Sequence, residues 1–340
     1  MADRTSLRDA VDGLHLAGLV RGLDALGVLD ALAAPTTATE AAAACRVDPG
    51  LLRICLEYVA GTGDVIARDG DRFVATPAWD GDARAYVRQY VGAFGPLTAD
   101  VAAVLRRLDA GPGLIDRAEQ ARSYAGARTV APVVAQLVGQ LELVPVLDLG
   151  CGPGSLLVEL GARHPGEGAI GWGVDASEEM CAAATAGLAA HGLAERATIV
   201  RGDALAPGGP ARLGQHGGIP TAAVRSIVAT SLLNELWGPG RGRPTIAAWL
   251  GELAGAFPGR ALIVADYFGC VGHTAPPWPA QTALHDLMQA LSGQGVPPPD
   301  REPWLAAYRD AGADLLHMVE DEDATFFIHL VRLPGDPRQG

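Results

Sequence analysis

The chain has 340 residues, and all 26 of its basic residues are arginine. This length accommodates two domains of ordinary size, and the 49% apolar composition supplies a core for each. The absence of lysine excludes Schiff-base chemistry and a lysine-dependent phosphate loop. The net charge of −13 argues against nucleic acid and anionic membranes as partners, because their phosphates would be repelled. We therefore expect a small-molecule substrate.

The remaining composition predicts a cytoplasmic protein with free thiols. Its apolar stretches are well short of the roughly 20 residues that a membrane-spanning helix needs. Residues 1–16 carry three aspartates, whereas a secretory signal has basic residues followed by an apolar run. The five cysteines are odd in number and lack metal-binding or redox spacing, so we expect buried, unpaired thiols.

The first part of the chain is predicted to be mostly helical. Apolar residues recur at helical spacing from about residue 5 to residue 33. Thr37 and Glu40 stand in capping-box register before an alanine-rich helix. Asp48 and Pro49 suit the N-cap and the first residue of the next one. Three helices are therefore expected in quick succession.

A short hairpin is expected after these helices. Val65–Arg68 and Arg72–Ala75 alternate in polarity around an Asp-Gly-Asp turn. Helices followed by a hairpin predict a winged-helix domain over residues 1–100. Nine arginines against fourteen acids argue against DNA binding by this domain. The apolar stripes of its first helices predict a homodimer, with ordinary core packing as the alternative. A helical connector over residues 101–144 is expected to follow this domain.

Strands and helices alternate from residue 145 onward. This pattern predicts an α/β domain over residues 145–340, with a parallel sheet covered by helices on both faces. The end differs, because Asp314–Val319 and Thr325–Arg332 are joined by a turn too short for a crossover helix and must be antiparallel. The expected parallel strands are Val146–Leu149, Ala169–Val174, Ala197–Arg201, Ala223–Ala229 and Arg260–Ala265.

A glycine-rich turn follows the first of these strands and precedes a helix expected near Ser155. Gly150, Gly152 and Gly154 are spaced as G-x-G-x-G. Glycines are needed where the backbone turns sharply and approaches a ligand without Cβ atoms. The dinucleotide fingerprint has a further glycine where this chain has Ser155, so a pyrophosphate is the less favoured ligand.

Carboxylates end the next two strands. Asp175 lies 25 residues after Gly150, and its two oxygens suit the two hydroxyls of a ribose, with a helix N-cap as the alternative. Asp203 ends the third strand with a second carboxylate. Because the carboxyl ends of parallel strands open into one crevice, we expect Gly150, Asp175 and Asp203 to converge there.

The glycine segment resembles the first motif of class I S-adenosylmethionine methyltransferases. The whole chain resembles the two-domain O-methyltransferase family that modifies phenols and antibiotic intermediates in plants and bacteria. The resemblance implies a Rossmann-like sheet with an antiparallel C-terminal strand, a winged-helix dimerisation domain and S-adenosylmethionine as the cofactor. The cofactor-binding residues that it implies are Asp148, Gly150, Gly152, Gly154, Asp175, Asp203 and Ser231.

The chain departs from the family at the residue that serves as general base. The family has a histidine where this chain has Asn234, and a carboxamide cannot take a proton near neutral pH. Glu235 preserves the acid that follows, with a helix N-terminal carboxylate as the alternative. His285 lies on a later helix that passes over the acceptor pocket in the family, with a packed core histidine as the alternative. Asn234, Glu235 and His285 are therefore the candidate catalytic residues.

One branch of the family methylates the carbon beside the carbonyl of α-keto acids. In that branch a metal held by two histidines chelates the keto acid, and His285 matches one of the two. A divalent or iron metal ion on His285, Glu235 and Asn234 is therefore an open alternative, although Asn234 is a weaker ligand than histidine.

Candidate acceptor-binding residues come from the connector and from the segment after the fourth strand. Arg122 and Arg128 can pair with a substrate carboxylate, and Tyr124 stands one helical turn before Arg128. Trp237 can wall the acceptor site. Surface arginines and a tryptophan buried for packing are the alternatives.

We thus expect a small-molecule methyltransferase of natural-product biosynthesis, and the loss of the base histidine favours C-methylation beside a carbonyl. The alternatives are O-methylation of a phenol or hydroxyl, a methyltransferase-fold protein without methyl transfer, and a DNA-binding regulator.

Overall fold

The computed structural model describes residues 6–124, 130–206, 208–209, 212–213, 218–238, 240–321 and 326–335. The chain divides into two compact units, which are described separately below. The first comprises Met1–Thr98 with Arg122–Arg128, and the second comprises Ala99–Ala121 with Thr129–Gly340. The residues expected to form one connector, 101–144, are therefore divided between the units. In the described parts of the chain, every helix is too short or too polar to cross a bilayer.

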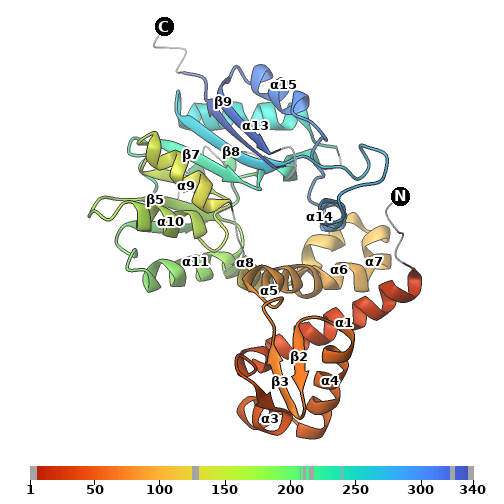
Figure 1. Cartoon of the computed structure of the whole chain (residues 1–340). Coiled ribbons are helices and arrows are strands. Elements are labelled where there is room, and N and C mark those ends of the chain that lie inside the picture. The colour runs from red at the N-terminus through yellow and green to blue at the C-terminus, as the bar shows by residue number, and fades with distance from the viewer. Residues whose placement is uncertain are drawn as a thin grey trace. The chain divides into compact units, whose positions relative to one another are not determined.

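The first unit has four helices followed by a small antiparallel sheet (Figure 1). The helices are α1 (Leu7–Ala25), α2 (Val28–Ala31), α3 (Ala38–Cys45) and α4 (Pro49–Thr62). The sheet has the order β1 (Thr36–Thr37), β3 (Arg72–Ala75) and β2 (Ile66–Asp69). The capping box of Thr37 and Glu40 and the Asp48 cap before Pro49 are both formed, as the sequence predicted. The hairpin also lies where it was expected.

The remainder of the first unit is helical again. It contains α5 (Gly81–Val87), the π-helical turn Arg88–Ala93 and most of α6 (Gly95–Ala99). Leu32, Leu56 and Phe73 lie in its core, which joins the helices to the hairpin. The chain continues through α7 (Val101–Arg106), the 3-10 helix Leu108–Leu114, α8 (Arg117–Tyr124) and α9 (Ala131–Gln140).

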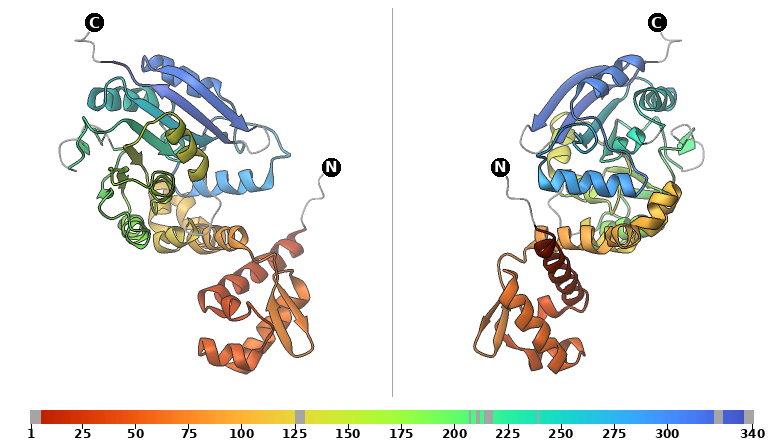
Figure 2. Two further views of the ribbon diagram at one scale, coloured as in Figure 1. Left: turned by 60° about the vertical axis from the view of Figure 1, so that its left-hand side comes forward. Right: turned by 90° about the vertical axis from the view of Figure 1, so that its right-hand side faces the viewer.

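The second unit is built on a seven-stranded sheet with the order β6-β5-β4-β7-β8-β10-β9. The strands are β4 (Val146–Leu149), β5 (Gly171–Asp175), β6 (Ala197–Arg201), β7 (Ser226–Thr230), β8 (Ala261–Tyr267), β9 (Asp314–Asp321) and β10 (Phe326–Arg332). The first five are parallel, and β10 pairs antiparallel with both β8 and β9. The expected fold class is confirmed. Figure 2 shows β9 and β10 in blue at one edge of the sheet.

Several strand boundaries differ from the sequence prediction by one to three residues, and β5 spans Gly171–Asp175 rather than Ala169–Val174. β7 begins at Ser226 rather than Ala223, because Ala223 closes a turn by donating its backbone N–H to the Pro220 carbonyl at 2.8 Å. β8 continues to Tyr267 rather than ending at Ala265, because Phe326 and Phe327 of β10 pair with its last two residues.

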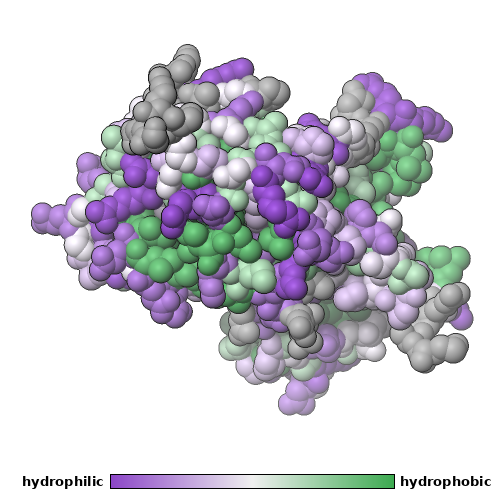
Figure 3. Space-filling view, turned by 90° about the horizontal axis from the view of Figure 1, so that it is seen from above, coloured by the Kyte–Doolittle hydropathy of each residue, from purple (hydrophilic) through white to green (hydrophobic). Residues whose placement is uncertain are grey.

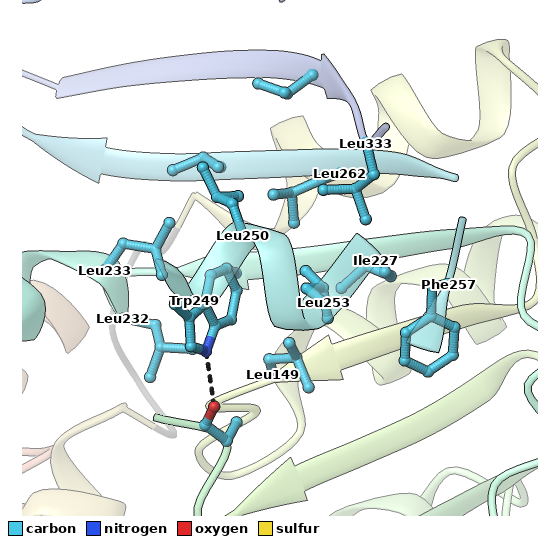
Figure 4. Packing of buried hydrophobic residues seen from close by; sticks show 14 of the residues in the cluster. Leu149, Ile227, Leu232, Leu233, Trp249, Leu250, Leu253, Phe257, Leu262 and Leu333 are labelled. Carbon is cyan, nitrogen blue, oxygen red and sulfur yellow. Dashed lines mark hydrogen bonds between the residues drawn. The ribbon is translucent and has the colours of Figure 1, made fainter. Parts of the chain in front are cut away.

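Helices cover both faces of the sheet, so successive residues of the central strands enter two different cores. Ile227 and Leu262 pack against α13 (Arg243–Ala256) and α15 (Glu302–Asp310) (Figure 4). Their neighbours Val228 and Ile263 pack against α9, α10 (Ser155–Arg163) and α11 (Glu178–Ala190). Burial on both faces explains why these strands are apolar throughout.

Large apolar side chains also reach the surface of the second unit. They include Leu316, Met318 and Val319 of the edge strand β9. Figure 3 shows an apolar area bordered by hydrophilic side chains on the face seen from above. Asp314 and Glu320 place negative charge near the two ends of the same strand, which disfavours antiparallel pairing with a second copy of that edge.

Candidate functional site

The glycine turn between β4 and α10 forms the floor of the candidate cofactor site. Gly150, Gly152 and Gly154 have φ angles of 69°, 52° and 81°, which favour glycine. The backbone N–H of Gly150 donates to the Val174 carbonyl at 2.8 Å, so the turn remains tied to β5. A Cβ atom at Gly150 would lie 2.9 Å from the Leu232 side chain. The predicted turn and the helix starting at Ser155 are both present.

Asp175 at the end of β5 holds this turn in place. One carboxylate oxygen accepts from the backbone N–H of Gly152 at 2.9 Å, and the other accepts from Ser177 N–H at 2.9 Å. The N-cap of α11 is Ser177, whose hydroxyl accepts from Met180 N–H. The alternative of Asp175 as the helix N-cap is therefore wrong. Each carboxylate oxygen keeps capacity for a second donor, such as a ribose hydroxyl.

Asp203 follows β6 and stabilises its own turn by accepting from the backbone N–H groups of Leu205 and Ala206. The next residue is anchored from the opposite side, since the Trp249 indole N–H of α13 donates to the Ala204 carbonyl at 2.7 Å (Figure 4). The Asp203 side chain remains exposed beside the ends of the strands. The topology thus brings the glycine turn, Asp175 and Asp203 to the ends of β4, β5 and β6.

Asp148 lies inside β4 directly before this turn and is 3% exposed. Burial, together with the nearby charge of Asp175, raises the pKa of Asp148 to about 8. Its carboxyl group is therefore largely protonated at neutral pH and can donate a hydrogen bond.

A 3-10 turn after β7, Leu233–Trp237, carries the predicted catalytic pair. Ser231 enters it with a φ of 47° and donates its backbone N–H to the Ala265 carbonyl. The Asn234 backbone N–H donates to Asp266 at 3.0 Å, and the Asn234 carboxamide oxygen is buried without a hydrogen-bond partner among the described residues. Asp266, at the end of β8, therefore anchors the turn.

Glu235 lies in the same turn and is partly buried. Burial raises the pKa of Glu235, and the carboxylates of Asp203 and Asp175 raise it further. A hydrogen bond from the Gln294 side chain and the charge of Arg117 lower it. Of the three predicted catalytic residues, Glu235 is the one whose pKa responds to the charges of Asp175 and Asp203.

His285 lies on α14 (Ala280–Leu291), where its side chain contacts Tyr267 and Gln289. Its ring stands edge-on to Tyr267 with 4.9 Å between the ring centroids. Its Nε2 atom is 3.2 Å from the Gln289 side-chain nitrogen. Burial lowers the pKa of His285, so the ring is neutral at pH 7.

The candidate acceptor residues are placed less directly. Arg122 and Tyr124 belong to the first unit, and Arg128 lies outside the described residues. Their role in acceptor binding stays a prediction. Trp237 lies edge-on to Trp304 at 5.3 Å and packs against the core on the α13 face, as its packing alternative predicted.

The residues offered as metal ligands do not fit a metal ion well. The Glu235 carboxylate is engaged by Gln294, and His285 Nε2 faces the Gln289 amide. Within the segments that the structure describes, no three His, Cys, Asp or Glu side chains gather closely enough to bind a metal. We therefore derive no catalytic step through a metal.

Sequence reasoning missed three residues of this region. Asp266 ends a buried strand, as Asp175 does, and that position could have revealed it. Arg117 and Gln294 gave no such signal, because they act on Glu235 from segments far away in the chain.

Residues 146–212 match the family model described as a methyltransferase domain. The match spans the glycine turn, Asp175 and Asp203, so the chain carries an S-adenosylmethionine-dependent methyltransferase domain. No curated protein matches the chain by sequence.

Solved structures of methyltransferases share the whole fold. The mitomycin 7-O-methyltransferase MmcR has 19% identity and a TM-score of 0.69, with 96% of each chain covered. Human N-acetylserotonin methyltransferase, solved with SAM, has 14% identity and a TM-score of 0.68, with 99% of this chain and 100% of that chain covered. The methyltransferase of calicheamicin biosynthesis CalO1, in its SAH-bound form, has 22% identity and a TM-score of 0.58, with 98% and 100% covered.

Proposed function

We propose that this protein transfers the methyl group of S-adenosylmethionine to an acidic hydroxyl, a phenol or an enol, of a small natural product, and that Glu235 takes the proton. The observation that carries this proposal is the position of the Glu235 carboxylate, which interacts electrostatically with Asp175 and Asp203. The cofactor supplies an electrophilic methyl group, and the protein supplies orientation and a proton acceptor.

The cofactor is expected to lie across the ends of β4, β5 and β6. The glycine turn lets its methionine part approach the backbone, and Asp175 and Asp203 suit its ribose and adenine. Asp148, protonated by burial, can donate a hydrogen bond below the turn. These assignments rest on the strand-end geometry and on the chemistry of the side chains.

Glu235 compensates for the histidine that Asn234 replaces. A partly buried carboxylate with a raised pKa is a stronger base than an exposed one, so it can accept a proton as the methyl group arrives. An acidic hydroxyl suits such a base. A carbon beside a carbonyl is a much weaker acid without a chelating metal, and the donor groups near His285 do not fit a metal. C-methylation, which the sequence favoured, therefore becomes the alternative.

The proposed acceptor class is small molecules of secondary metabolism. Several proteins of the same fold are named for mitomycin, calicheamicin and pyocyanin biosynthesis. Their names support the class of acceptor rather than a particular compound, and the acidic charge of this chain supports a neutral or cationic acceptor.

The test is product analysis with S-adenosylmethionine that carries a labelled methyl group. The protein should methylate members of a panel of phenols, enols and α-keto acids, and NMR of the product should place the label on oxygen. A label on carbon would favour the alternative reaction. Absence of any product, with cofactor binding intact, would support a fold relative without methyl transfer.

We also propose a homodimer formed through the first unit. Leu7 and Leu14 of α1 are 82% and 65% exposed, and Leu51 and Ile54 of α4 are also exposed. An isolated chain would leave these apolar side chains in water, whereas a symmetric partner would cover them. The cytoplasmic location stays a prediction from the sequence.

A further inference from the structure

A series of hydrogen bonds connects α14 to Glu235. Gln289 contacts His285 on α14, and the Ser292 hydroxyl donates to the Gln289 backbone carbonyl at 2.9 Å. The same hydroxyl lies 3.1 Å from the Gln294 side-chain oxygen, and the Gln294 side-chain nitrogen donates to Glu235 Oε1. The segment that ends α14 therefore reaches the carboxylate in the crevice.

The Ser292 hydroxyl lies 3.1 Å from the Gln294 amide oxygen, on the side of the amide away from the NH₂ group that donates to the carboxylate. Ser292 is 1% exposed, which protects this arrangement from competing water.

The backbone around Gln294 is packed too tightly to shift. A Cβ atom at Gly295 would lie 2.3 Å from the Gly238 nitrogen and 2.5 Å from the Asn234 carbonyl oxygen. Glycine at 295 therefore lets this segment lie directly against the turn that carries Glu235.

We propose that Gln294 is a positioning residue for Glu235. The inference rests on the proposed function of Glu235 as the base. Gln294 would hold the carboxylate in place through its side-chain N–H donor and favour the ionised form of Glu235.

Other charged groups also influence whether Glu235 is ionised. Arg117 of α8 favours ionisation of the carboxylate, and Asp175, Asp203 and Asp266 oppose it. Burial also opposes ionisation. Because three carboxylates and burial stand against one arginine, the Gln294 hydrogen bond is expected to contribute substantially to keeping Glu235 charged at neutral pH.

The Gln294→Met variant tests this inference because methionine keeps the length of the side chain and lacks the N–H donor. Loss of a hydrogen bond to a charged group should raise the Glu235 titration midpoint by about one pH unit or more. On the acid limb of the pH–rate profile, that shift means about tenfold less ionised Glu235 and about tenfold lower turnover. Gln281→Met, on the exposed side of α14, is the matched control and should leave the midpoint unchanged.

The midpoint should be read directly by NMR of ¹³C-labelled glutamate carboxyl groups, with Glu235→Gln used to assign the signal. A Gln294→Met midpoint equal to that of the parent protein would overturn the inference. Should Gln294→Met fail to fold, Gln294→Ala, which also removes the N–H donor, should raise the midpoint in the same direction, and an unchanged value there would overturn the inference equally. Full turnover in Glu235→Gln would instead contradict the proposed function, and the NMR titration would still decide the role of Gln294.

Discussion

The cofactor half and the acceptor half of the second unit differ in how completely their polar groups are satisfied. Around the glycine turn, both oxygens of Asp175 accept backbone N–H groups, and Asp203 accepts two more. In the acceptor half, Asn234, Trp237 and Gln289 each have a buried side-chain atom without a hydrogen-bond partner among the described residues. A buried polar atom left without a partner is costly, so the hydrogen bonding of the first region is the more complete of the two.

The largest effect is expected from Asp175→Ala in the cofactor half. The change removes the acceptor for the ribose hydroxyls and the bonds that hold Gly152 and Ser177. The two ribose hydrogen bonds to a charged acceptor could contribute ~3–6 kcal/mol in total, so cofactor binding should become undetectable by calorimetry. The exposed Asp64→Ala is the matched control. Near-native affinity in Asp175→Ala would show that the ribose is held elsewhere.

Asp148→Asn should change how the free energy of unfolding of the protein depends on pH. The folded-state pKa of Asp148, about 8, lies above the ordinary value of 3.8, so its protonated form contributes stability that is lost as the pH rises from about 4 through 8. Asparagine cannot ionise, and the variant should lose less stability than the parent protein over this range. Burial raises the pKa of Asp266 to about 7, so part of the dependence of stability on pH should remain in the variant.

Urea unfolding at several pH values between 5 and 8, without cofactor, measures this difference. Asp64→Asn should follow the parent protein. Parallel stability curves for Asp148→Asn and the parent protein would mean that Asp148 is ionised in the folded state.

A change in the first unit is expected to have the smallest effect on the cofactor and acceptor regions of the second unit. Leu14→Asp places a charge on the exposed apolar face of α1 and should convert the proposed dimer into a monomer with unchanged cofactor affinity. Light scattering at micromolar concentration reads the mass, and the polar substitution Thr62→Ser on α4 serves as a control. A parent protein that is already monomeric would contradict the proposed dimer.

The cofactor half could be predicted from sequence because each of its groups directly follows a strand. Gly150, Asp175 and Asp203 need only the strand order to be brought together. The acceptor half could not, because its contacts join distant segments. Asp266 accepts from Asn234 across 32 residues, and Gln294 donates to Glu235 across 59. The periodicity of apolar residues indicates which face of a helix is buried, but it does not indicate which residues distant in sequence form hydrogen bonds with each other.

The central claim is that Glu235 takes the proton during methyl transfer, and single-turnover kinetics of Glu235→Gln test it most directly. With cofactor bound and acceptor saturating, the rate of methyl transfer should fall by ~10²-fold or more, the size expected for a lost general base. Cofactor affinity should stay unchanged, and the exposed Glu195→Gln should react at the parent rate. A Glu235→Gln variant that transfers the methyl group at the parent rate would show that Glu235 is not the base.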